Sequence, residues 1–274
     1  MPETRNKTCN VSTLRKAYRF LRLTKHASLL FGPRYRRSRS LIEIDITYSC
    51  NMRCLNCDRS CRQAPSEESM TVAQIGKFTQ ESRDKGIKWE RIRVLGGEPT
   101  NHPDLLKILD VLLEYKNTYS PETKIELWTN GFGENAAETL KKVPQDLKIQ
   151  NSHKTSGLQA FEPFNLAPQD SLLNPLFDYS LGCHVTENCG MGLTPYGYYP
   201  CAASGGIDRI FGYNLGRKEL PDFNEEMTDQ MRAFCRLCGH YATYMKTIRT
   251  EEVSPTWKKA YESYSKKKFQ LDRY

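Results

Sequence analysis

The feature that most limits what this chain can fold into is residues 41–57, where a strand pattern runs directly into three closely spaced cysteines. Within 41–47, isoleucines alternate with polar side chains, and a period of two predicts a β-strand with one buried face. Cys50, Cys54 and Cys57 follow with the spacing Cys-x3-Cys-x2-Cys. Three thiolates this close in sequence can hold three corners of an iron–sulfur cube and leave the fourth iron without a protein ligand. An open metal position of this kind is where a substrate or cofactor binds.

A second motif stands about 40 residues further along the chain. An apolar strand pattern over 90–95 runs into Gly96 and Gly97, and Glu98 and Pro99 follow directly. Two glycines let the backbone approach a ligand closely, and a carboxylate suits a charge-assisted hydrogen bond from a cationic amine. Three cysteines alone would also fit a zinc ribbon; the second motif at this distance favours the cluster.

Together the two motifs resemble those of the radical S-adenosylmethionine (SAM) superfamily, whose cluster loop reads CxxxCxxC and whose second motif reads GGE. The resemblance implies that the three cysteines hold a [4Fe–4S] cluster whose open iron chelates the amino and carboxylate groups of SAM. It also implies that the segment 96–99, with Glu98 at its centre, accepts hydrogen bonds from the SAM ammonium group. An electron from a donor such as flavodoxin or ferredoxin would cleave SAM to methionine and a 5′-deoxyadenosyl radical, which takes a hydrogen atom from the substrate.

Further SAM-site positions follow from the same resemblance. Thr129 and Asn130 resemble the Thr-Asn-Gly that these enzymes place at the SAM side of the pocket, and Ser152 stands where many members contact the ribose or the substrate. Asn56 precedes the third cysteine, where the family usually has an aromatic or apolar residue against the adenine, so this chain departs from the pattern there. Cys61 has no place in the family pattern, and we expect it to be a bystander.

The order of predicted elements is β and α in alternation. After the first strand, the pattern predicts helix 70–85, strand 90–95, a helix after Asp104, strand 124–129, helix 134–142 and strand 146–150. Alternation of this kind predicts an α/β fold with a parallel sheet, whose ligand groups gather beyond the carboxyl ends of the strands. By resemblance, the architecture is the partial (β/α)6 TIM-like barrel of radical SAM enzymes.

Five further cysteines come late in the chain and predict a second metal site. A hairpin pattern around a Pro-Tyr-Gly turn at 195–197 lies among them, and a knuckle-like Cys-x2-Cys follows. Four thiolates of this kind suit zinc or a [4Fe–4S] cluster. They resemble the Twitch domain, the shorter relative of the SPASM domain, although three residues separate the hairpin Gly197 from its cysteine where the family has four. The expected ligands are Cys183, Cys201, Cys235 and Cys238, with Cys189 as the rival of Cys183.

A cluster with four protein thiolates has no free iron for a substrate, so we expect it to transfer electrons. A substrate radical that passes its electron to this cluster undergoes a net two-electron oxidation, and a general base must then take a proton. His153 and His184 are candidates for that base by residue type. A structural zinc without a redox role is the alternative.

The charge distribution and the composition limit where the protein can be located and what it can bind. Residues 1–40 carry eleven Lys and Arg against one Glu, and residues 254–274 carry six against two acids, so the remaining 23 basic and 29 acidic residues leave the body at −6. No apolar run reaches the roughly 18 residues that a membrane span needs. Ten cysteines without a secretion signal indicate metal ligation, and we expect a cytoplasmic location.

The sequence predicts four parts. They are a basic N-terminal extension over 1–40, the partial barrel over 41–180, a Twitch-like domain over 181–245 and a basic C-terminal helix over 246–274. Residues 1–10 are expected to be disordered, and a basic amphipathic helix over 11–31 could touch an anionic surface or pack on the barrel as a cap.

The function predicted is a radical SAM oxidoreductase that oxidises a small sugar-like or cyclitol-like molecule. The first alternative is a radical SAM maturase that cross-links or epimerises a ribosomally made peptide. The second is a zinc-rich module that binds nucleic acid through the basic tails, which the GGE motif and the βα order disfavour.

Overall fold

The computed structural model describes residues 13–157, 164–242 and 252–274. The disorder expected for residues 1–10 lies outside these ranges. The strands are β1 Leu41–Thr47, β2 Arg91–Gly96, β3 Lys124–Thr129, β4 Lys148–Asn151, β5 Met191–Thr194 and β6 Gly197–Tyr199. They form one sheet in the order β4-β3-β2-β1-β5-β6, in which only β6 runs antiparallel to its neighbour. The predicted α/β fold with a mostly parallel sheet is therefore confirmed.

The hairpin predicted between the late cysteines is present as β5 and β6, and β5 pairs in parallel with β1. Its strands therefore extend the same sheet as the first four strands. The partial barrel and the domain boundary at 180/181 stay predictions.

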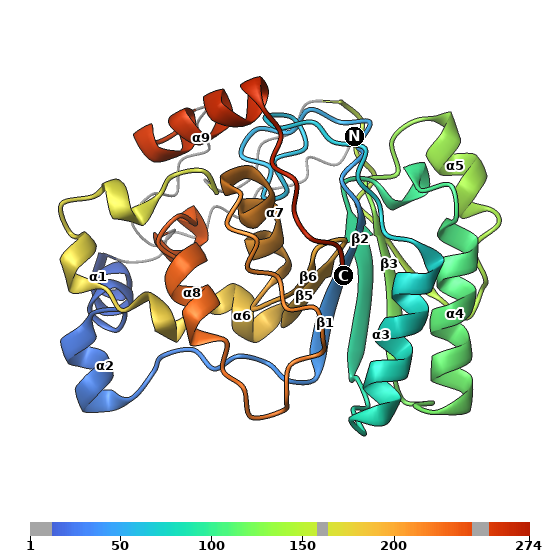
Figure 1. Cartoon of the computed structure of the whole chain (residues 1–274), viewed down its shortest axis with the longest axis horizontal. Coiled ribbons are helices and arrows are strands. Elements are labelled where there is room, and N and C mark those ends of the chain that lie inside the picture. The colour runs from blue at the N-terminus through green and yellow to red at the C-terminus, as the bar shows by residue number, and fades with distance from the viewer. Residues whose placement is uncertain (1–12, 158–163, 243–251) are drawn as a thin grey trace.

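Helices α3 (Val72–Asp84), α4 (Leu105–Thr118) and α5 (Glu134–Leu140) lie on one side of the sheet (Figure 1). The isoleucines of β1 point to this side and pack with Phe78 of α3 and Leu109 of α4 in the main core. Thr71 caps α3 in a reciprocal capping box with Gln74, which fixes where the helix begins. The elements expected from the alternating pattern are thus confirmed, with boundaries that move by at most two residues.

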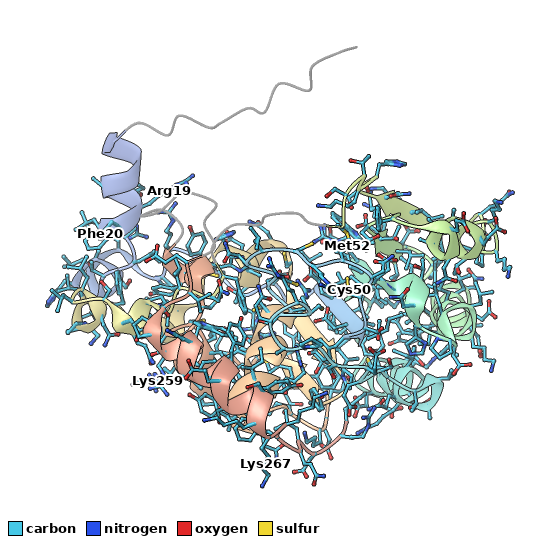
Figure 2. The ribbon with its side chains drawn as sticks, turned by 90° about the horizontal axis from the view of Figure 1, so that it is seen from above. Arg19, Phe20, Cys50, Met52, Lys259 and Lys267 are labelled. Atoms are coloured by element: carbon cyan, nitrogen blue, oxygen red, sulfur yellow. The ribbon has the colours of Figure 1, made fainter. Side chains whose placement is uncertain are left out.

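On the opposite side lie α6 (His184–Asn188), α7 (Ala202–Phe211) and α8 (Thr228–Phe234), with α9 (Pro255–Lys266) beyond them (Figure 1). Short 3-10 turns punctuate the connections at Pro99–Asn101, Pro168–Asp170, Asn174–Leu176, Tyr179–Leu181 and Gly239–Ala242. The C-terminal helix, predicted from its basic residues, also buries Trp257 fully in a second core. Its lysines remain on the outer side, as Lys259 and Lys267 show in Figure 2.

The helix predicted over 11–31 is two helices, α1 (Thr13–Leu21) and α2 (Lys25–Phe31), because the side chain of Thr24 caps a new start. Leu23 is buried against Phe177, so the segment packs on the protein. The end of α2 exposes an apolar row of Leu29, Leu30 and Phe31. Contact with an anionic surface stays a prediction. Within the described ranges, no helix is long and apolar enough to cross a bilayer.

Two helical glycines provide a test of the packing. A Cβ added to Gly205 in α7 would lie 2.4 Å from Cγ2 of Thr194 on β5, whereas a Cβ on Gly76 in α3 would meet nothing within 4 Å. We expect Gly205→Ala to destabilise the fold by about 1–3 kcal/mol through overpacking. The matched Gly76→Ala should stabilise it by roughly 0.5–1 kcal/mol, because alanine loses less backbone entropy in a helix. Thermal midpoints at one scan rate check both; equal shifts of the two variants would contradict the close packing of α7 on β5.

Candidate active site

The expected ligand groups follow the carboxyl ends of four neighbouring parallel strands. Cys50 comes after β1, Glu98 after β2, Asn130 after β3 and Ser152 after β4. Figure 2 shows Cys50 and Met52 beyond the end of β1. The strands of this order run parallel, so these positions share one edge of the sheet, as the sequence predicted.

The backbone of the GGE motif is bonded to the start of the cysteine loop. The Gly97 N–H donates to the Thr47 carbonyl at 2.7 Å, and the Glu98 N–H donates to the Ser49 carbonyl at 2.8 Å. A Cβ at Gly96 would lie 2.3 Å from the Thr47 oxygen, and one at Gly97 would lie 2.2 Å from the Ser49 oxygen. The glycines were expected to admit a ligand; in the described structure they admit the end of β1, so the two motifs hold each other in place.

The carboxylate of Glu98 is fully buried and joins β2 to β3. Its Oε1 accepts hydrogen bonds from the N–H and hydroxyl of Thr100 at 3.1 and 2.8 Å and from the Thr129 hydroxyl at 2.6 Å, and its Oε2 accepts from the Asn130 N–H at 2.8 Å. Each carboxylate oxygen can accept about two hydrogen bonds. Oε2 therefore keeps room for one further donor, which fits the expected ammonium group. Pro99, also expected at this site, is buried as the first residue of the turn that follows.

Hydrogen bonds converge on the sulfurs of the cluster loop. The thiol of Cys61 bonds to the sulfurs of both Cys50 and Cys57, and this is the main cause that lowers the pKa of each of these two thiols against the effect of burial. Backbone N–H groups add to it, from Met52 to Cys50 and from Arg59 and Cys61 to Cys57. Hydrogen bonds to sulfur favour the thiolate, which is the form that binds metal. The loop is therefore suited to hold an iron–sulfur cluster.

Cys61, expected to be a bystander, thus lies among the cluster-loop thiols, and Cys54 is buried in the same loop. Asn56, at the expected adenine position, is 2% exposed and has a φ of 52°. Asparagine is one of the few residues that adopt this left-handed conformation readily. The backbone therefore explains the residue type, and the adenine contact stays a prediction.

Four of the late cysteines form a second buried group. Cys183 and Cys201 interact electrostatically, and Cys235 and Cys238 each interact with both. Burial is the largest cause that raises the pKa of all four thiols, to about 12 for Cys183. Thiols that resist ionisation in this way need a bound cation to become thiolates, and metal binding supplies one.

Cys189, the rival for the first ligand, points elsewhere. Its sulfur lies 3.8 Å from Nη1 of Arg93 and hydrogen-bonds to Glu43, and its effect on Cys183 is the smallest of those acting on that thiol. Burial raises the pKa of Cys189 to about 12. Among the described residues, no set of three or more Cys, His, Asp or Glu side chains is close enough to hold a single metal ion. A cube binds its thiolates at separate irons, and so tolerates wider spacing than one zinc ion does.

Between the two cysteine groups lies a network of buried charges that the sequence analysis missed. The Arg59 guanidinium contacts Glu43 at 3.2 Å, Asp45 at 3.1 Å and Asp58 at 2.6 Å. Burial disfavours the charge of Arg59, but the three carboxylates outweigh it and hold its pKa well above the usual value. Burial raises the pKa of Asp45 to about 6, although Arg59 acts in the opposite direction.

The network continues across the sheet as a row in register. Glu43 on β1 lies opposite Arg93 on β2, which lies opposite Glu126 on β3, which lies opposite Lys148 on β4. The three contacts measure 3.0, 3.4 and 3.2 Å. The Arg93 guanidinium also lies 4.7 Å from the centre of the Trp128 ring, and Trp128 is 40% exposed. This end of the row, at Trp128 and Lys148, reaches the surface.

The alternation in β1 that predicts buried isoleucines also indicates that the charged residues between them share the opposite face of the sheet. On β1 the charged residues Glu43 and Asp45 alternate with isoleucines, and on β2 Arg91 and Arg93 stand on either side of Ile92. In a parallel sheet, such positions on neighbouring strands share one face. The register between neighbouring strands, which places opposite charges side by side, cannot be read from the sequence of any single strand.

The two candidate bases and Ser152 occupy different surroundings. His153 follows β4 in an exposed turn with a φ of 45°, and Ser152 beside it donates to the Thr129 carbonyl at 3.1 Å. His184 begins α6 next to Cys183, with its ring 6.3 Å from that of His240. His153 is thus placed near the strand ends and His184 near the second cysteine group, and the role of each as a base stays a prediction.

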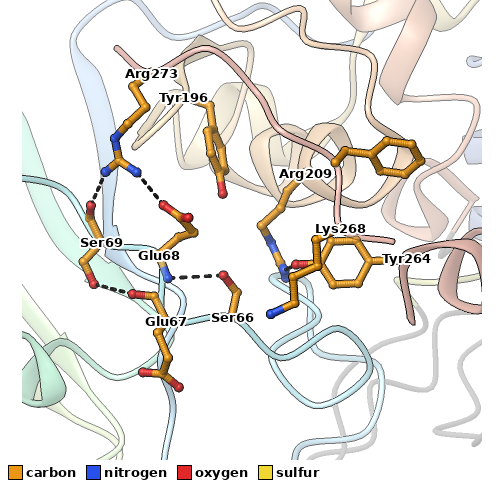
Figure 3. A pocket seen from close by; sticks show the side chains of 10 residues that line it. Ser66, Glu67, Glu68, Ser69, Tyr196, Arg209, Tyr264, Lys268 and Arg273 are labelled. Atoms are coloured by element: carbon orange, nitrogen blue, oxygen red, sulfur yellow. Dashed lines mark hydrogen bonds and ion pairs between the residues drawn. The ribbon is translucent and has the colours of Figure 1, made fainter. Parts of the chain in front are cut away.

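A separate hollow of about 500 Å³ is lined by residues 66–69, Tyr196, Arg209 and four residues of the C-terminal segment (Figure 3). None of its lining residues is a cysteine or belongs to the charged row. It is not the site described above.

Comparison with known proteins identifies a domain in the chain. Residues 44–151 match the sequence profile of the "Radical SAM superfamily". The chain carries a radical SAM domain. A radical SAM domain binds a [4Fe–4S] cluster and SAM, which agrees with the sulfur environment of its cysteine loop.

Similar proteins include two named "GTP 3′,8-cyclase". That of Campylobacter jejuni is 31% identical over 114 residues, 41% of this chain and 32% of that protein, and that of Sulfurimonas denitrificans is 27% identical over 148 residues, 52% and 42%. The aligned part is well under half of each relative's length. A solved structure described as "BtrN in complex with AdoMet and 2-DOIA" covers 80% of this chain and 98% of its own, at 15% identity and a TM-score of 0.39.

Glu98 allows a direct test of the link between β2 and β3. In Glu98→Gln, one carboxylate oxygen becomes an amide NH2, so a buried donor of Thr129 or Asn130 loses its acceptor. We expect a loss of about 1–3 kcal/mol of unfolding free energy, together with weaker SAM binding. Glu67→Gln, at an exposed position, is the control. A Glu98→Gln protein as stable as this control would show that the buried contacts of Glu98 contribute little.

Proposed function

We propose that this protein uses the radical SAM domain to oxidise a small, polar, uncharged or zwitterionic molecule by two electrons, with a second [4Fe–4S] cluster as the electron acceptor. Cys50, Cys54 and Cys57 would hold the SAM-binding cluster, and Glu98 would accept a hydrogen bond from the SAM ammonium group. Cys183, Cys201, Cys235 and Cys238 would hold the second cluster.

The observation that carries this proposal is that both cysteine groups border the same charged face. We use this name for the ion-paired network around Arg59 together with the row from Glu43 to Lys148. Cys201 interacts electrostatically with Glu43 and Arg59 of that face, and Cys238 interacts with Asp58. Arg59 and Asp58 themselves follow directly on Cys57. A substrate held on this face would lie between a source of radicals and an acceptor of electrons.

This placement accounts for a two-electron oxidation of the substrate. When bound, the SAM-binding cluster and SAM supply a 5′-deoxyadenosyl radical, which removes one hydrogen atom from a C–H bond of the substrate. An alcohol carbon that has lost this hydrogen atom becomes a carbonyl when it loses one more electron and the hydroxyl proton. The four-thiolate site would take the electron, and a base must take the proton. Glu43 and Glu126 lie on the face itself and are added to His153 and His184 as candidates for this base.

The balance of charge on this face favours a substrate that is uncharged or zwitterionic. Arg59, Arg93 and Lys148 are matched by Glu43, Asp45 and Glu126 in direct ion pairs. A ligand with several negative charges would have to displace these carboxylates from buried cations, which costs several kcal/mol per broken pair. A polyol or aminopolyol can instead share the hydrogen bonds of such pairs, and the Trp128 ring offers an apolar surface beside them.

The names of the similar proteins favour a second candidate, a cyclisation of GTP or another nucleotide. That similarity covers less than half of each relative. The described charged face has no excess of positive charge for a triphosphate, since its ion pairs join Arg59, Arg93 and Lys148 to Glu43, Asp45, Asp58 and Glu126. The test below separates the two.

Reduction of anaerobically reconstituted protein with dithionite in the presence of SAM should release 5′-deoxyadenosine, because the first cluster needs no substrate to cleave SAM slowly. The Cys54→Ala protein should release none. Chromatography of the products measures both. A fully iron-loaded wild-type protein that leaves SAM intact would overturn the enzymatic proposal, and conversion of added GTP to a cyclised product would replace the oxidation with the second candidate.

Iron counts test the second cluster. Cys235→Ala should lose about four irons per chain, because Cys235 lies in the buried group of four. Cys189→Ala is the matched control and should keep them, since Cys189 contacts Glu43 and Arg93 instead. Loss of iron in Cys189→Ala with full retention in Cys183→Ala would reverse the ligand assignment, and stoichiometric zinc without this iron would remove the electron acceptor.

A further inference from the structure

The cluster loop contains a fourth thiol that the radical SAM motif does not use. Cys61 is 9% exposed, and its sulfur hydrogen-bonds to the sulfurs of Cys50 and Cys57. Its backbone N–H also points at the Cys57 sulfur. The loop therefore reads Cys-x3-Cys-x2-Cys-x3-Cys, with the fourth sulfur folded back onto two of the three ligands.

The segment that carries Cys61 is held firmly from the other half of the protein. Arg209 of α7, 2% exposed, donates to the carbonyls of Arg59 and Ala64 at 2.9 and 2.8 Å, one on each side of Cys61. Tyr264 accepts a hydrogen bond from the same guanidinium at 2.8 Å, and the two side chains lie side by side in Figure 3. A buried arginine that spans two carbonyls fixes the segment between them.

Two further features orient the thiol of Cys61 toward the ligand sulfurs. Ser60 adopts a φ of 51°, a left-handed conformation that is costly for serine. Its hydroxyl bonds to the Tyr261 hydroxyl at 2.8 Å, which compensates part of that cost. The strained residue comes directly before Cys61, so the turn that brings the sulfur back toward Cys50 and Cys57 is maintained by contacts with α9.

We propose that Cys61 is an exchangeable fourth ligand of the SAM-binding cluster: its thiolate binds the iron that the three motif cysteines leave open, and it gives up this position when SAM arrives. The proposal rests on the proposed function only in that it needs the SAM-binding cluster. A sulfur that contacts two of the three ligand sulfurs is within reach of the cluster they hold. A thiolate in that place would shield the open iron from water and other small ligands.

The exchange balances without an outside reagent. The Cys61 sulfur–iron bond breaks and the SAM amino nitrogen–iron and carboxylate–iron bonds form. The SAM ammonium group gives up one proton when its nitrogen binds iron, and the departing Cys61 thiolate takes up one proton. No electron is transferred.

The test compares reconstituted wild-type protein with Cys61→Ala and Cys61→Ser, each checked for a full iron count. Without SAM, the EPR signal of the reduced SAM-binding cluster in wild type should differ from that in both variants, and the three signals should coincide once SAM is bound. SAM should bind the variants roughly three- to tenfold more tightly, because a competing ligand lowers the fraction of protein that is ready to bind. Difference spectra with and without SAM isolate this cluster, since the second group has no open iron position.

The Cys61→Ser variant distinguishes a role of Cys61 as an iron ligand from a role as a hydrogen-bond donor. Serine keeps a donor at this position but is a poorer ligand for iron, so a ligand role predicts that serine behaves like alanine. A serine variant that matches wild type, or equal EPR signals and equal SAM affinity in all three proteins, would reduce Cys61 to a hydrogen-bonding neighbour and overturn the proposal. Loss of about four irons in Cys61→Ala would make Cys61 a permanent ligand and also overturn it. None of these outcomes depends on turnover, whereas the proposed function is tested by the release of 5′-deoxyadenosine from the wild-type protein, so the two can fail separately.

Discussion

The site depends on the contact between the ends of β1 and β2. Two backbone hydrogen bonds join Gly97 and Glu98 to Thr47 and Ser49, and the spaces where side chains would stand at Gly96 and Gly97 are filled by backbone oxygens. The cysteine loop begins immediately after this contact. Because Glu98 also receives donors from Thr129 and Asn130, the loops after three strands are fixed to one another before any cofactor is bound. Such preorganisation lets binding energy act on the ligand instead of on ordering the loops.

Local patterns predicted the strands and helices because the residues responsible are neighbours in sequence. The alternation in 41–47, the helical pattern in 70–85 and the turn at 195–197 each specify an element by themselves, and the structure contains all three. The single helix expected over 11–31 failed for a tertiary reason: Thr24 caps a second helix while Leu23 is buried against Phe177, 154 residues away in sequence. No periodicity within the segment contains that contact.

The site could be predicted as far as its motifs extended. Cys50, Glu98 and Asn130 were found because each stands in a recognisable sequence at a strand end, and the four-cysteine group was found from residue type and spacing. The row of Glu43, Arg93, Glu126 and Lys148 was not found, because it exists only through the register of four parallel strands. Cys61 was set aside for a related reason: its position among the ligand sulfurs depends on Arg209 and Tyr261, which lie far away in sequence.

The two cysteine groups differ in their electrostatics, and this difference matches two kinds of site. In the cluster loop, hydrogen bonds to Cys50 and Cys57 lower the pKa of their thiols despite burial, so the loop itself stabilises the thiolate form. In the second group, burial raises the pKa of every thiol, and repulsion from neighbouring cysteines adds to this at Cys183, Cys235 and Cys238, so metal binding has to favour the thiolates there. A loop that stabilises thiolates by hydrogen bonds can hold a cluster with one position left to an exchanging ligand. A buried group of four thiols suits a cluster whose positions are all occupied, and such a cluster changes only its electron count.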